Sequence, residues 1–148
     1  MKNFTFESYQ KFLERLRPDK LNDLDLFVTE DILFIDPLHH VVGSEKMKGL
    51  LRNLFSAFDE IKYRVDNYSI NNDQVFFEWT LNATRKGIPF CIKGVTKLKV
   101  NVSGKVCQHI EYWDVASQFY EKIPVLGFVV RYLRKFITKK SLRSTNPS

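Results

Sequence analysis

The chain has 148 residues, of which 44% are hydrophobic and 27% charged, and these values suit one folded domain and exclude a largely disordered chain. No uncharged stretch is long enough to cross a membrane, and residues 1–9 lack the apolar core of a secretion signal. Cys91 and Cys107 do not form a Cys-x-x-Cys motif, so we expect no zinc or redox centre. We therefore expect a cytoplasmic protein with two free cysteines.

The net charge of +6 is concentrated at the end of the sequence. Six basic residues and no acidic residue lie from Arg131 onward, which leaves 17 basic and 17 acidic residues in the first 130. Because the body of the chain carries no basic field and no nucleic-acid-binding motif, we expect no specific nucleic-acid partner. Only the C-terminal stretch has the charge to attract an anionic surface.

The first 60 residues predict three helices and one short strand. Apolar residues recur at helical spacing over 6–16 and, more briefly, over 21–27. Residues 31–36 read as a brief strand. Ser44 is expected to cap a third helix, which has an apolar stripe over 44–58.

After residue 61 the apolar period changes from 3.6 to 2, which predicts a meander of long strands. The predicted strands cover residues 62–70, 74–85, 90–100 and 105–114. A helix over 115–122 and another from Pro124 to about Thr138 follow. Helices gathered on one side of an antiparallel sheet predict an α+β domain, and long twisted strands would curl around a helix and leave a conical cavity. We assign residues 1–140 to this single domain and 141–148 to a flexible tail.

Every second position near the end of the last predicted strand carries a polar or aromatic side chain, namely His109, Glu111 and Trp113. The period of a strand places all three on one face. A tight turn at 103–104 would pair Thr96 with His109 and Gly94 with Glu111. That face carries none of the lysines of the preceding strand, so we expect it to face inward, although a shift of one residue would reverse it.

A second set of residues is expected to line the cavity and to bind a small apolar or aromatic ligand. The set is Phe12, Phe77, Trp79, Leu81, Thr96 and Trp113, with His39 on the loop after the first strand. Taken singly, each apolar member is better explained as core than as a ligand contact. A metal site built from Asp36, His39 and His109 lacks a ligand spacing such as His-x-x-x-His, and no nucleotide-binding loop is present, so we expect neither metal nor cofactor.

Three segments carry a resemblance to a known family. They are Phe34-Ile35-Asp36-Pro37 with Val42-Gly43-Ser44 and its helix, the meander over 75–81 and 90–100, and the strand over 105–114. Over roughly residues 4–136 the chain resembles the SnoaL-like polyketide cyclase and ketosteroid isomerase superfamily, which has the nuclear-transport-factor-2-like cone fold. Residues 119–127 are similar to a bacterial branch of that group.

The resemblance implies a catalytic base. Ketosteroid isomerases have their base in an Asp directly before Pro, the place of Asp36, although Asp-Pro also ends strands and opens turns in unrelated proteins. The tyrosine that donates to the oxyanion in that family falls at Phe12, and its protonated aspartate falls at Thr96. Phe12 cannot donate a hydrogen bond and Thr96 is a weaker donor, so steroid isomerisation by that mechanism is not expected.

Two functions stay open at this point. The first is an isomerase, cyclase or hydrolase in which Asp36 is the base and His109 with Glu111 moves a proton. The alternative is a non-catalytic ligand-binding, regulatory or adaptor module, in which His109 and Glu111 simply satisfy each other inside the barrel. Its basic amphipathic helix, 124–140, would then bind a partner or, weakly, an anionic membrane. The resemblance also implies a homodimer.

Overall fold

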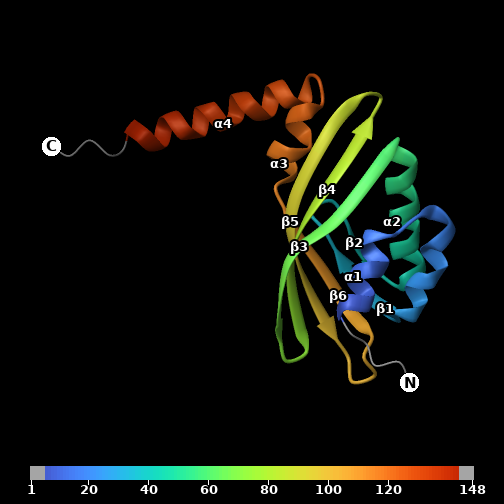
Figure 1. The fold of residues 1–148 in the computed structure, drawn as a ribbon. Coiled ribbons are helices and arrows are strands. Elements are labelled where there is room, and N and C mark those ends of the chain that lie inside the picture. Colours follow the sequence, from blue (N-terminus) through green and yellow to red (C-terminus); the bar gives the residue numbers. More distant parts are fainter. Residues whose placement is uncertain (1–5, 144–148) are drawn as a thin grey trace. The chain divides into compact units, whose positions relative to one another are not determined.

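We describe the protein from a computed structural model, which covers the backbone of residues 6–143 and the side chains of residues 6–138. The chain divides into two compact units, and the boundary lies between Trp113 and Asp114. Figure 1 shows the ribbon of both units. The first unit carries the sheet, and the second consists of short helices followed by one long helix.

The first unit combines helices with a six-stranded sheet in the order β2-β1-β6-β5-β4-β3. Its helices are α1 (Phe6–Glu14), the 3-10 helix η1 (Pro18–Leu26) and α2 (Ser44–Ala57). Its strands are β1 (Val28–Ile35), β2 (His40–Val42), β3 (Glu60–Asn71), β4 (Gln74–Arg85), β5 (Ile88–Val100) and β6 (Val106–Trp113). Helices α1 and α2 lie along one side of the curved sheet (Figure 1). The expected α+β architecture is confirmed.

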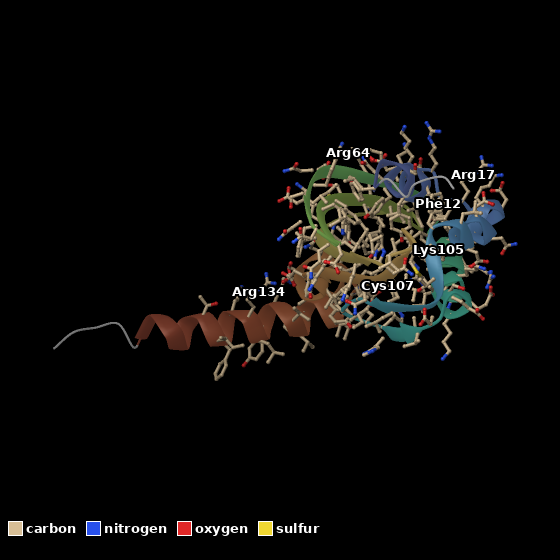
Figure 2. The ribbon with its side chains drawn as sticks, turned by 90° about the horizontal axis from the view of Figure 1, so that it is seen from below. Phe12, Arg17, Arg64, Lys105, Cys107 and Arg134 are labelled. Atoms are coloured by element: carbon tan, nitrogen blue, oxygen red, sulfur yellow. The ribbon has the colours of Figure 1, made fainter. Side chains whose placement is uncertain are left out.

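The core lies between this sheet and the helices. The residues of β4 that were predicted to face inward are each less than a tenth exposed: Val75, Phe77, Trp79, Leu81 and Ala83. From the other side, α1 buries Phe6, Tyr9 and Leu13, which are spaced to share one helix face. Charged residues such as Arg17 and Arg64 lie at the outside of the unit, around the packed interior (Figure 2).

A buried lysine on α2 pairs with a carboxylate on η1, a contact that no pattern in the sequence predicts. The Lys48 side chain is 2% exposed, and its Nζ lies 2.5 Å from Asp25 Oδ2 and 2.7 Å from Glu45 Oε1. The hydrogen bond from Lys48 lowers the pKa of the Asp25 carboxyl. Both carboxylates reach solvent, so the cation is neutralised at the edge of the core and not deep within it.

The first part of the sheet differs from the prediction in three ways. β1 begins at Val28, three residues before the predicted start, and it ends at Ile35, so Asp36 lies just beyond the strand. β2 was not predicted, because three residues are too few to show a period. Finally, β1 runs parallel to β6, so the sheet is mixed and not purely antiparallel.

The cap of α2 is also one residue earlier than predicted. Gly43 is the N-cap and adopts a φ of 113°, while Ser44 is the first helical residue. A side chain at this positive φ would be strained, which explains why glycine occupies the position.

The predicted pairing of β5 with β6 was wrong by two residues. Thr96 pairs with Glu111, and Leu98 pairs with His109, whereas Thr96 was expected opposite His109. The register shifts at a bulge between residues 99 and 100. Because side chains alternate with period 2, an even shift leaves His109 and Glu111 on the predicted inner face.

The connection between these strands explains the error. The predicted two-residue turn at 103–104 is a longer loop that Asn101 organises. Asn101 Oδ1 accepts hydrogen bonds from the backbone N–H groups of Ser103 and Lys105, at 3.1 and 2.9 Å. These side-chain hydrogen bonds replace a tight hairpin turn. The β5–β6 pair nearest the loop is therefore Val100 with Val106, whereas the tight turn would have paired Val100 with Lys105.

The second unit begins with a capped helical turn. Asp114 caps α3 (Val115–Gln118) by accepting a hydrogen bond from the Ser117 N–H, as predicted. The single helix expected over 115–122 is instead divided, because Phe119 leaves helical geometry before the 3-10 helix η2 (Tyr120–Lys122).

The long helix α4 (Leu126–Arg143) begins two residues after Pro124, where the sequence predicted its start. It continues past the predicted end at Thr138, and residues 144–148 of the predicted tail lie outside the described residues. Arg134 Nη1 lies 2.9 Å from Glu121 Oε1, which ties α4 to η2. None of the described helices is both long and apolar enough to span a membrane.

Candidate functional site

A chain of three hydrogen-bonding side chains lies inside the first unit. The Tyr9 hydroxyl is 3.0 Å from His109 Nδ1, and His109 Nε2 is 3.0 Å from Glu111 Oε1. β6 positions His109 and Glu111 two residues apart on one face, and α1 brings Tyr9 over them. Tyr9 is fully buried and His109 is 2% exposed, whereas the Glu111 side chain is 20% exposed.

The direction of these hydrogen bonds follows from the chemistry of the three groups. Burial, and then the negative charge of Glu111, raise the pKa of the Tyr9 phenol well above its ordinary value. Tyr9 therefore keeps its proton and donates it to His109 Nδ1, and the Nε2–H on the other side of the ring donates to Glu111. Both bonds run toward the Glu111 carboxylate. Oε2 of that carboxylate makes no hydrogen bond to any side chain among residues 6–113.

Aromatic rings enclose the His109 imidazole. The centroid of Phe34 lies 5.3 Å from that of His109, and Phe77 meets the same ring edge-on at 6.4 Å. Phe12 stacks on Tyr9 at 6.2 Å and on Phe27 at 4.8 Å. Phe12 and Phe77 were predicted to line a ligand site, and here they shield the hydrogen-bonded chain from water. In such an apolar setting each hydrogen bond is electrostatically stronger than in water.

Trp79 and Thr96, both predicted to contact ligand, are bonded to each other. Trp79 Nε1 donates to Thr96 Oγ1 at 2.9 Å, and Thr96 is fully buried opposite Glu111. Gly94 makes room for the indole ring. A Cβ at position 94 would lie 2.5 Å from Trp79 Cζ2 and 2.8 Å from the Tyr112 carbonyl oxygen. Because Gly94 has no Cβ, the Trp79 ring can pack directly against the backbone of β5.

Tyr63 on β3 brings a further hydroxyl that sequence reasoning missed. It alternates with Val65 on the inner side, and its ring centroid lies 5.6 Å from that of Trp79. The hydroxyl oxygen is buried and has no hydrogen-bond partner among the described residues. Burial, and then the Glu111 charge, raise the pKa of Tyr63 well above its ordinary value. The only signal in the sequence was a tyrosine at an inward position of an alternating strand.

Asp36 and His39 form a separate pair at the end of β1. Asp36 Oδ1 accepts from the backbone N–H groups of Leu38 and His39, at 2.7 and 2.6 Å. His39 Nδ1 lies 3.0 Å from both carboxylate oxygens. The Asp36 side chain is 14% exposed and His39 is exposed. Asp36 therefore closes the turn into β2, which is the structural role that its place before proline also fits.

The strand register relates Asp36 to the buried chain. Ile35 pairs with Ile110 in the parallel ladder, so the next step brings Asp36 level with Glu111. Of the two predicted catalytic carboxylates, Glu111 thus lies in β6 and Asp36 lies just past the end of the neighbouring strand β1. Each of them is hydrogen-bonded to a different histidine. Within residues 6–138 no three His, Cys, Asp or Glu side chains gather as a metal ion would require.

The other predicted residues are also on the inner side of the sheet. Leu81 is 9% exposed and Trp113 is half-buried, with Trp113 paired to Gly94. Cys91 and Cys107 are both free, as expected. The structure therefore brings Tyr9, His109 and Glu111 into direct contact and leaves the Asp36–His39 pair as a distinct cluster.

Solved structures share this fold at low sequence identity. A nuclear-transport-factor-2-like protein of unknown function from an Exiguobacterium species has a TM-score of 0.64 at 20% identity, over 74% of this chain and 97% of that one. An LEH-like epoxide hydrolase from M. tuberculosis gives 0.62 at 15% identity, over 77% and 83%. TerC, co-crystallised with polyporic acid, gives 0.63 at 13% identity, over 73% and 87%. These similarities confirm the cone fold.

Comparison at the level of sequence identifies the family, whereas the solved structures show only the fold. No curated protein matches the chain. A sequence model of the SnoaL-like domain matches residues 9–109, which run from the Tyr9 of the buried chain to its His109. The match spans more than half of the 148 residues, from within α1 through β5 and into the first half of β6. The chain belongs to the SnoaL-like domain family.

Proposed function

We propose that the first unit binds a small apolar or aromatic molecule and transfers a proton on it, with Glu111 as the acid and base. The observation that carries this proposal is the unbroken chain from Tyr9 through His109 to Glu111, enclosed by aromatic rings. Proteins of similar fold include an LEH-like epoxide hydrolase and TerC, which was co-crystallised with polyporic acid. An isomerase, cyclase or hydrolase reaction suits this arrangement.

The roles follow from the hydrogen bonds. His109 donates to Oε1 and so holds the carboxylate in place, with Oε2 as the oxygen that takes a proton from the ligand. Tyr9 selects the imidazole tautomer by donating to Nδ1. The proton that Glu111 accepts can return to a different atom of the same ligand. The chain therefore serves both halves of a proton transfer without a cofactor.

Asp36 is proposed as a second carboxylate of the site, in agreement with the family resemblance. Its place directly after Ile35, which pairs with Ile110 next to Glu111, supports a shared ligand, with His39 as an exposed contact. Phe12, Phe77, Trp79, Leu81, Thr96 and Trp113 are proposed to shape the apolar surroundings. Two of Asp36's hydrogen bonds serve the turn, so its proposed role in proton transfer is secondary to that of Glu111.

Native mass spectrometry of the purified protein, before and after denaturation, tests the ligand. A non-covalent adduct that leaves on denaturation identifies the chemical class to assay. Glu111→Gln and Asp36→Asn are then compared in that assay. We expect Glu111→Gln to lower turnover by about 10²–10⁴-fold and to keep binding. A Glu111→Gln variant as active as the wild type would disprove the assignment.

A second candidate function rests on α4. Five large apolar side chains on this helix are each at least half exposed: Phe128, Tyr132, Leu133, Phe136 and Ile137. All of the net positive charge of the chain lies from residue 131 onward. Apolar and basic side chains on one helix are typical of weak binding at an anionic membrane surface, at about 1 kcal/mol for each basic residue near it. The protein would then be a ligand-binding regulatory module.

Vesicle co-sedimentation tests this alternative. We expect the full chain to bind phosphatidylglycerol vesicles at low salt, to release at high salt, and not to bind phosphatidylcholine. The double variant Phe128→Ser with Phe136→Ser should bind less. Equal binding by the variant and the wild type would show that the apolar side chains of α4 do not bind the membrane.

We also propose a cytoplasmic homodimer that pairs through the outer face of the sheet. Val95 and Tyr112 face each other across β5 and β6 and are 38% and 57% exposed. Both cysteines are free, which favours a reducing compartment. Tyr112→Lys should turn a dimer into a monomer in analytical ultracentrifugation. A monomeric wild type would refute the dimer.

A further inference from the structure

The turn between η2 and α4 is built around one residue, Glu121. Arg131 Nη1 donates to the Glu121 carbonyl oxygen at 2.9 Å, and Arg134 Nη1 lies 2.9 Å from Glu121 Oε1. Gly127 packs directly on the same carbonyl group, because a Cβ at position 127 would overlap it. Three residues of α4 thus contact Glu121, and these contacts fix the start of the helix on η2.

The same turn holds Val125 in a backbone conformation that valine rarely adopts. Its φ is 69°, in the left-handed region, where a β-branched side chain is strained. Strain of this kind persists only where the surrounding contacts impose it, and it is concentrated in functional segments. The Val125 side chain is 81% exposed, so its own packing does not explain the conformation. The contacts of Glu121 do explain it, and we refer to residues 121–127 as the elbow.

The contacts of the elbow determine which side of α4 is exposed. With 3.6 residues per turn, Arg131 and Arg134 share one side of the helix, and this side faces Glu121. The apolar side chains lie away from the arginines, in two rows in which neighbours are four residues apart. Each of these side chains is at least 45% exposed: Phe128, Tyr132 and Phe136 in the first row, and Val129, Leu133 and Ile137 in the second. About half of the helix circumference is therefore apolar and exposed.

The charge of the second unit identifies the partner that suits this apolar side. Residues 114–148 contain two acidic residues, Asp114 and Glu121, and seven basic ones: Lys122, Arg131, Arg134, Lys135, Lys139, Lys140 and Arg143. A second copy of the unit would bring the same excess of positive charge, whereas an anionic bilayer brings the opposite charge. Two paired helices also bury only a narrow seam, and the two rows on α4 are wider than such a seam. Helices that lie in a lipid surface bury a wide apolar side of this kind.

We propose that Glu121 is a positioning residue for membrane binding: through the elbow it holds α4 with both apolar rows toward an anionic lipid surface and with Arg131 and Arg134 away from it. This inference rests on the second candidate function, the binding of α4 to an anionic membrane. It adds which side of the helix meets the lipid and which residue determines that side. The exposed Lys135, three residues after Tyr132, lies beside the first row and is placed to reach the headgroups.

Two variants with the same change of charge test the role of Glu121. Glu121→Gln and Asp114→Asn each remove one negative charge from the second unit, and asparagine can still cap α3. Affinity of the full chain for phosphatidylglycerol vesicles is measured by co-sedimentation at low salt. If charge alone governed binding, the two variants would bind equally tightly. We expect Glu121→Gln to bind about fivefold less tightly than Asp114→Asn, because a helix that is no longer held in place must be ordered on binding.

Tryptophan quenching tests the orientation of α4 while Glu121 is in place. Phe136→Trp puts the probe in the first apolar row, and Thr138→Trp puts it on the side of the arginines. The wild type supplies the background signal of Trp79 and Trp113. Brominated phosphatidylglycerol vesicles should quench the added tryptophan of Phe136→Trp and leave that of Thr138→Trp unquenched. Equal quenching at both positions would overturn the proposed orientation.

The possible results separate this proposal from the function on which it rests. If the wild type binds phosphatidylglycerol vesicles and the Glu121→Gln and Asp114→Asn variants have equal affinities, the role of Glu121 is overturned while membrane binding stands. If the wild type does not bind these vesicles at low salt, the second candidate function fails, and the inference about Glu121 fails with it.

Discussion

The Tyr9 hydroxyl lies 3.0 Å from His109 Nδ1, although the two residues are 100 positions apart in the chain. One belongs to the first helix and the other to the last strand of the sheet. Their hydrogen bond therefore forms only when α1 has packed against the completed sheet. The bond therefore links the folding of the unit to the orientation of His109, which belongs to the proposed proton-transfer site. One substitution at Tyr9 tests both.

Tyr9→Phe removes that bond and leaves His109 Nδ1 buried without its donor. We expect the free energy of unfolding to fall by about 1–3 kcal/mol, which is the usual effect of leaving a buried polar group unpaired. Urea denaturation followed by circular dichroism measures the change. Tyr112→Phe, whose side chain is exposed, should change stability by less. Equal stability of Tyr9→Phe and wild type would show that the bond contributes nothing to the fold.

Glu111→Gln keeps the size of the side chain and removes its ability to accept a proton. Turnover of a ligand found by native mass spectrometry should fall by about 10²–10⁴-fold, which is the usual contribution of a general acid or base. Ligand affinity should change little. Asp36→Asn should have the smaller effect, because Asp36 already serves the turn into β2. The opposite order of the two variants would assign the main role to Asp36.

Gly94→Ala should lower the free energy of unfolding by about 1–3 kcal/mol, because the added Cβ overlaps the Trp79 ring and the Tyr112 carbonyl oxygen. Gly49→Ala is the control, since a Cβ at position 49 meets nothing within 4 Å. It lies in α2 and should stabilise the helix by about 0.5–1 kcal/mol. Chemical denaturation of the two variants checks the difference, and equal effects would contradict the packing argument.

Alkaline pH should destabilise the first unit through Tyr9 and Tyr63. Both phenols have pKa values raised by burial in the folded protein. The unfolded phenols ionise near pH 10, so the stabilising effect is complete below that pH and is lost as the pH rises above it. Each tyrosine adds about 1.4 kcal/mol per pH unit to the loss. Urea unfolding at pH 8, 10 and 11 should show a shallower decline for Tyr63→Phe than for wild type, and parallel curves would argue against the raised pKa of Tyr63.

Much of the fold is readable from local patterns. The alternation of Val75, Phe77 and Trp79 predicted the inner face of β4, and the cap at Asp114 was correctly placed. His109 and Glu111 were predicted to share the inner face, because a two-residue spacing within one strand determines this directly. Such features depend on neighbours a few residues apart, which the sequence displays.

Features that depend on residues far apart in the sequence were decided by tertiary packing. The bulge at 99–100 and the loop organised by Asn101 set the register, and β2 exists only because β1 offers it a partner edge. The pairing of Tyr9 with His109, and the unpaired hydroxyl of Tyr63, depend on which elements lie against each other. The sequence by itself determined which faces turn inward, since side-chain direction follows local backbone geometry. Only the tertiary structure decided which polar groups meet, because a hydrogen bond requires two atoms within about 3 Å and no local period encodes that distance.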